Sequence, residues 1–186
     1  MSNKQEPQVR ALKRLILAHD TFQGVVDACE FLISGDSDEH AQFYGTFFSG
    51  ICVSYMRPFM SAAGLGPLPA DYSTFPNNPD HARTHEDLKN GRNWAYAHNS
   101  PDQAAGLLAI PQEQEEHKKI RFIFDSHGIT FLPAEVTWPK SRLPAIVSLC
   151  QFQIEHVKRD VHALVKHLGE GKTYKAGEYI IGETFP

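Results

Sequence analysis

Apolar side chains recur every fourth residue between positions 43 and 60, on two adjacent rows. The first row is Phe43, Phe47, Ile51, Tyr55 and Phe59, and the second is Tyr44, Phe48, Cys52, Met56 and Met60. Two neighbouring rows with this spacing predict a helix whose wide apolar face is buried on much of its surface. Pro58 is expected to bend or end this helix, and the Gly- and Pro-rich stretch 64–69 prevents its continuation.

Helical spacing also begins near the amino terminus. Pro7 suits a first helical turn, and the apolar residues that follow at helical spacing are Val9, Leu12, Leu15 and Ile16. A second apolar stretch, 25–33, either continues this helix or follows a break near Gly24. Asp36, with Glu39 three residues on, can cap the start of the next helix.

Two more helices are expected in the second half of the chain. Asn78-Pro79 is a strong opening, with Asn as cap and Pro at the first helical position, and the helix should reach about His98. A last long helix is expected from Ile146 to Leu168, with Gly169 after it. Its apolar face is formed by Val147, Cys150, Ile154, Val157, Val161 and Val165.

The period changes to two around position 120. Ile120, Phe122 and Phe124 alternate there with Arg121 and Ile123. The turn sequence Asp-Ser-His-Gly follows at 125–128, and a second run extends from 129 to 136. This pattern predicts a β-hairpin at about 119–137. The whole chain is therefore expected to be mainly α, a helical bundle of four to five helices with an inserted β-hairpin. Residues 1–186 would form a single domain with a short tail at 171–186.

Composition supports a globular protein without a metal or disulfide framework. Apolar residues make up 41% of the chain, charged residues 22%, and the formal net charge is −4, unlike the basic excess of proteins that track long nucleic acids. Cys29, Cys52 and Cys150 lie far apart in apolar runs, so we expect buried, reduced thiols. The polar amino terminus lacks a signal-peptide core, and no run is long enough to span a membrane, so a cytoplasmic location is expected.

The chemical signal is concentrated between His85 and Asp102. This segment holds Arg92, Asn93 and His98 within a short helix and its exit. An arginine offers a planar, permanently charged fork suited to phosphate, and a histidine can exchange a proton near neutral pH. Together they suffice for metal-free RNA cleavage, in which a 2′-hydroxyl loses its proton to the histidine and attacks the adjacent phosphate.

The segment resembles the HEPN superfamily of helical-bundle proteins. The signature of that superfamily is an arginine followed by a polar residue, with a histidine after four to six intervening residues. Arg92, Asn93 and His98 match it, with five residues between the arginine and the histidine. The resemblance implies a metal-independent endoribonuclease that acts on single-stranded RNA. Many relatives are toxins or defence effectors that work as homodimers, and an antitoxin partner is possible.

The spacing alone also occurs from Arg14 to His19 and from Arg121 to His127, but no polar residue follows the arginine there. On an ideal helix, Arg92 and His98 would lie about 120° apart around the axis and about 9 Å apart along it. Either the helix distorts or ends near His98, which Gly91 makes easier, or each arginine completes the site of a partner subunit.

Other residues have both a substrate-binding and a plain structural interpretation. His85 either orients Arg92 or contacts RNA, or is a surface histidine paired with a carboxylate. Arg57 either adds a second positive charge or is solvated at a helix end. Tyr96 either stacks on a base or fills apolar space, and Asn99 either contacts RNA or terminates the helix.

We expect neither a metal nor a cofactor. His81 and His85 have the spacing of a metal-binding pair, but no HExxH motif accompanies them. The histidines of the last helix, His156, His162 and His167, are expected to be solvated. Two alternatives to catalysis remain: a catalytically inactive HEPN-like module that binds a nucleotide or RNA, and a helical interaction protein without catalysis.

Overall fold

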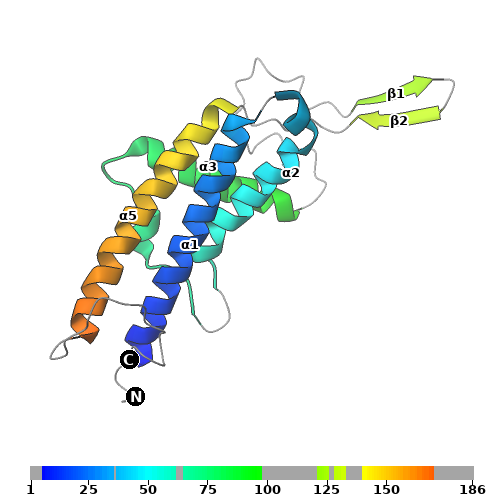
Figure 1. The fold of residues 1–186 in the computed structure, drawn as a ribbon. Coiled ribbons are helices and arrows are strands. Elements are labelled where there is room, and N and C mark those ends of the chain that lie inside the picture. Colours follow the sequence, from blue (N-terminus) through cyan, green and yellow to red (C-terminus); the bar gives the residue numbers. More distant parts are fainter. Residues whose placement is uncertain are drawn as a thin grey trace.

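The computed structural model describes residues 6–35, 37–61, 65–97, 121–125, 128–132 and 140–169. Within these ranges it describes the side chains of residues 6–35, 46–61, 65–93 and 140–169. The described chain is mainly α, with four long helices packed as a bundle (Figure 1). None of the described helices is both long enough and apolar enough to cross a membrane.

Two long helices, α1 (Glu6–Ser34) and α5 (Leu143–Leu168), lie side by side and run in opposite directions (Figure 1). At one end, Lys140 Nζ donates a hydrogen bond to the carbonyl oxygen of Gly35 at 3.0 Å. At the other end, Leu12 and Leu168 are buried together. Helix α1 passes through Gly24 without a break, so the two apolar stretches expected near the amino terminus belong to one helix.

Helix α2 (Ser37–Met56) packs on α1 and continues into the 3-10 turn η1 (Arg57–Phe59). Pro58 lies in that turn, which confirms that it ends the α-helix. The expected wide apolar face is also confirmed, because both rows contribute buried residues: Phe48, Ile51, Cys52, Tyr55 and Met56. The cap expected at Asp36 and the side chains of Phe43 and Tyr44 lie outside the described residues.

Helix α3 (Pro79–Ala97) packs on α2 and α5, and the short turn η2 (Ala70–Ser73) precedes it. Asn78 Oδ1 accepts a hydrogen bond from the backbone N–H of His81 at 3.0 Å, which confirms the predicted cap. Helix α5 begins three residues before the predicted Ile146, because Pro144 occupies its first turn after η4 (Lys140–Arg142). Gly169 ends it, and its N–H donates to the carbonyl oxygen of Val165 at 2.8 Å.

Strands β1 (Arg121–Asp125) and β2 (Gly128–Leu132) pair antiparallel, with Phe122 opposite Phe131 and Asp125 opposite Gly128. These strands lie within the range expected for the hairpin. The predicted tail at 171–186 lies outside the described residues.

The three cysteines are free and buried, as the sequence predicted. Burial raises the pKa of the Cys29 thiol to about 12, and it also raises the pKa values of the Cys52 and Cys150 thiols. These thiols therefore stay protonated and serve as small apolar groups in the core.

Candidate functional site

The candidate site lies on the carboxyl-terminal half of α3, which is held tightly against α2. Gly91 is the closest point of approach, since a Cβ atom built there would lie 2.6 Å from Cys52 Sγ and 3.5 Å from Cys52 Cβ. No side chain larger than hydrogen fits that gap without a shift. We predicted that Gly91 makes helix distortion easier, and the structure gives this glycine a further role in helix packing.

A second contact, at His85, joins the same two helices six residues before Gly91 along α3. Tyr55 Oη lies 2.8 Å from His85 Nδ1, in a buried hydrogen bond. The His85 ring also contacts Phe59 and Phe75 edge-on or tilted, with centroids 5.0 Å and 5.5 Å away. His85 is 7% exposed, so the interpretation of a surface histidine paired with a carboxylate is wrong.

Burial determines the protonation states of His85 and Tyr55. It lowers the pKa of His85 below the ordinary value of 6.5, while Glu86 opposes that shift. It also raises the pKa of Tyr55 well above 10. Both side chains are therefore neutral at neutral pH, and the Tyr55 hydroxyl can donate to an unprotonated Nδ1.

The arginine and the polar residue of the motif contact each other directly. Arg92 Nη1 donates a hydrogen bond to Asn93 Oδ1 at 3.0 Å. Arg92 is half-buried next to the tight contact at Gly91, whereas Asn93 is exposed. The guanidinium is thus oriented by its neighbour while its helix is fixed against α2.

Other predicted site residues lie partly outside the described structure. His98 and Asn99 are not among the described residues, and Tyr96 is described only as part of the α3 backbone. The roles predicted for these three residues, and a contact of His85 with RNA, stay predictions.

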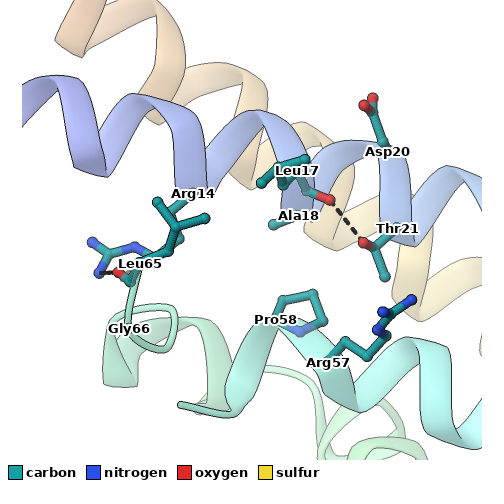
Figure 2. A pocket seen from close by; sticks show the side chains of 9 residues that line it. All are labelled: Arg14, Leu17, Ala18, Asp20, Thr21, Arg57, Pro58, Leu65 and Gly66. Atoms are coloured by element: carbon teal, nitrogen blue, oxygen red, sulfur yellow. Dashed lines mark hydrogen bonds between the residues drawn. The ribbon is translucent and has the colours of Figure 1, made fainter. Parts of the chain in front are cut away.

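Arg57 is exposed and lines a groove between α1 and the segment that follows α2 (Figure 2). The groove has a volume of about 430 Å³. Arg14 reaches it from α1 and donates from Nη1 to the carbonyl oxygen of Leu65 at 3.3 Å. Asp20 lines the same groove as the two arginines, so the groove carries charges of both signs, and the substrate-binding role of Arg57 stays a prediction.

Sequence reasoning missed one cluster, formed by Asp71 of η2 with His156 and Asp160 of α5. The side chain of His156 is only 12% exposed, so the expectation that it is solvated is wrong. The spacing of His156 and Asp160, one helical turn apart, is a signal that could have drawn attention to the pair. Nothing local in the sequence places Asp71 beside them.

We compared the chain with protein-family models, curated proteins and solved structures, and found no match in any of the three.

Proposed function

We propose that the protein is a metal-independent endoribonuclease of HEPN type that cleaves single-stranded RNA. Arg92 holds the phosphate, His98 removes the proton from the 2′-hydroxyl, and Asn93 positions the arginine. The products are a 2′,3′-cyclic phosphate and a free 5′-hydroxyl, because the internal nucleophile displaces the leaving oxygen.

One observation carries the proposal: Arg92 donates to Asn93 Oδ1 on a helix that is fixed by two buried contacts. A guanidinium restrained in this way loses less conformational freedom when it binds the phosphate than one on a mobile loop. A lysine at position 92 could not make the two parallel hydrogen bonds that a guanidinium makes to phosphate oxygens.

The site is proposed to act in a homodimer, as the resemblance to the HEPN superfamily implies. Pairing of two copies would bring two sets of Arg92 and His98 to one cleft. The arginine of one copy could then act with the histidine of the other, although the two residues of one copy are separated on an ideal helix. A toxin or defence role, with an antitoxin partner, is the biological setting that the resemblance implies.

The test is cleavage of a labelled single-stranded RNA in excess EDTA by the wild type and by His98→Ala. Loss of a general base typically costs about 10²–10⁴-fold in rate, so His98→Ala should fall to the background. His127→Ala is the matched control, because His127 belongs to an arginine–histidine pair of the same spacing without the polar residue. Equal cleavage by His98→Ala and His127→Ala would overturn the assignment.

A further inference from the structure

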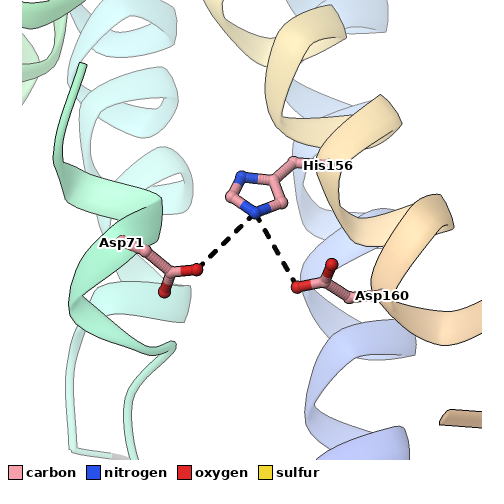
Figure 3. A group of neighbouring side chains, drawn as sticks. All are labelled: Asp71, His156 and Asp160. Atoms are coloured by element: carbon pink, nitrogen blue, oxygen red, sulfur yellow. Dashed lines mark ion pairs between the residues drawn. The ribbon is translucent and has the colours of Figure 1, made fainter. Parts of the chain in front are cut away.

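Three side chains that can bind a metal face one another between η2 and α5 (Figure 3). His156 Nε2 lies 3.7 Å from Asp71 Oδ2 and 3.7 Å from Asp160 Oδ2. All three ligand atoms lie within 4.8 Å of one another. The two distances of 3.7 Å are longer than a hydrogen bond but lie within the range of an ion pair, so the imidazole faces both carboxylates.

The buried Tyr72 orients two of the three groups. Its ring stacks on the His156 ring with centroids 4.0 Å apart and planes 11° from parallel, which fixes the direction of Nε2. Its hydroxyl donates to Asp160 Oδ2 at 2.8 Å. Such contacts behind the ligands are typical of metal sites, where they set ligand direction.

The surrounding charges leave the acidic character of the cluster intact. Arg159 Nε lies 3.4 Å from Asp160 Oδ1, which is the oxygen that does not bond to Tyr72. The carboxylates of Asp71 and Asp160 carry negative charge, and Arg159 offsets only part of it. A divalent cation would be attracted to the remaining charge.

We propose that Asp71, His156 and Asp160 bind a divalent transition-metal ion, with zinc as the best fit. Zinc bonds of about 2.0–2.2 Å in a tetrahedron place two ligand atoms about 3.3–3.6 Å apart, close to the separations of His156 Nε2 from the two carboxylates. The side chain of Asp71 is 61% exposed and can move inward to complete the site. An imidazole ligand favours zinc over magnesium or calcium, and three protein ligands leave a fourth position for water.

The metal would join η2 to α5 and stabilise the folded chain, because the three ligands come together only on folding. The proposed RNA cleavage uses α3 and needs no metal, so the two proposals are independent. Chelator should lower the melting temperature of the zinc-loaded protein and leave RNA cleavage unchanged at a temperature where the protein stays folded.

The test is thermal unfolding of the full chain after treatment with EDTA and dialysis, with and without zinc chloride. Zinc at about 100 times its dissociation constant should raise the melting temperature by roughly 5–10 °C. Asp71→Asn should lose most of this rise without damage to the fold, because the Asp71 side chain is largely exposed. His162→Asn is the matched control, an exposed histidine on the same helix outside the cluster, and it should keep the full rise.

Cobalt(II) gives a second measurement that does not depend on stability. The wild type should develop the intense visible absorption of a low-symmetry cobalt site, and His156→Asn and Asp71→Asn should not. The proposal is overturned if zinc leaves the wild type unchanged, or if Asp71→Asn responds like the wild type. Either result would mean that Asp71, His156 and Asp160 do not form a zinc site.

Discussion

Gly91 is the residue at which the packing of α3 on α2 leaves least room. Gly91→Ala adds a methyl group 2.6 Å from Cys52 Sγ, and this overpacking should cost about 1–3 kcal/mol of unfolding free energy. The higher helix propensity of alanine offsets at most about 1 kcal/mol of that cost. Urea unfolding of the wild type and of Gly91→Ala measures this difference in unfolding free energy.

Two further variants separate a steric clash from a general effect of alanine. Gly24→Ala is the matched control, because a Cβ atom there meets nothing within 4 Å, and it should leave stability unchanged or raise it. Adding Cys52→Ala to Gly91→Ala should recover part of the loss, since it removes the clashing sulfur. If Gly24→Ala and Gly91→Ala change the unfolding free energy equally, the close contact with Cys52 is not the reason for a glycine at position 91.

His85 should make stability depend on pH. Burial lowers its pKa in the folded state below 6.5, so above that pH both states are neutral and the histidine contributes no pH dependence. As the pH falls below 6.5 the unfolded chain binds the proton first, and stability decreases until the folded pKa is passed. The urea midpoint should therefore fall between about pH 7 and pH 5.

His85→Gln keeps a polar partner for Tyr55 but removes the titration, so its midpoint should fall less over the same interval. His81 remains in both proteins, and burial lowers its pKa as well, so some dependence should persist in the variant. Identical pH profiles for the wild type and His85→Gln would contradict the role given to this buried imidazole.

At the scale of elements, the Asn78 side chain caps the start of α3. Asn78 Oδ1 accepts from the N–H of His81, so Asn78→Ala should cost about 1 kcal/mol. Asn77→Ala is the control, because Asn77 is exposed and lies before the cap. Thermal unfolding should lower the melting temperature of the first variant only, and equal melting temperatures would mean that the cap does not stabilise the helix.

Local signals in the sequence were enough to predict most helix boundaries. Pro58, Asn78-Pro79 and Gly169 act within a turn of their own positions, through a missing N–H, a cap and a helix stop. The wide face of α2 was equally visible, because its buried residues are apolar.

The inward face of α3 could not be found in the same way. Among the α3 side chains that the structure describes (79–93), the buried residues recur at helical spacing but are mostly polar: His81, Thr84, His85 and Leu88. These positions therefore show no apolar pattern, and their side chains are accommodated by partners from other elements. His81 Nε2, for example, lies 3.2 Å from Ser148 Oγ of α5. For this reason His85 was predicted to orient Arg92, to contact RNA or to lie on the surface, and its burial was not predicted. The cluster of Asp71, His156 and Asp160 was missed because Asp71 is distant in the sequence.

At the scale of the whole molecule, we propose that the site is shared between two copies of the chain. Sedimentation at tens of micromolar should show a species of twice the monomer mass of 20.9 kDa. Two arginine–histidine sets would then share one cleft, so a mixture of Arg92→Ala and His98→Ala proteins should recover some activity that neither has alone. A protein that stays monomeric at this concentration would contradict the shared site.

The most direct test of the central claim uses the difference between RNA and DNA. A single-stranded oligonucleotide with one ribonucleotide among deoxyribonucleotides is incubated with the wild type in excess EDTA. We predict one cut, on the 3′ side of the ribonucleotide, with a 2′,3′-cyclic phosphate end, and no cut when a 2′-O-methyl group replaces the hydroxyl. Cleavage at the 2′-O-methyl site, or equal cleavage by His98→Ala, would contradict RNA cleavage by Arg92 and His98.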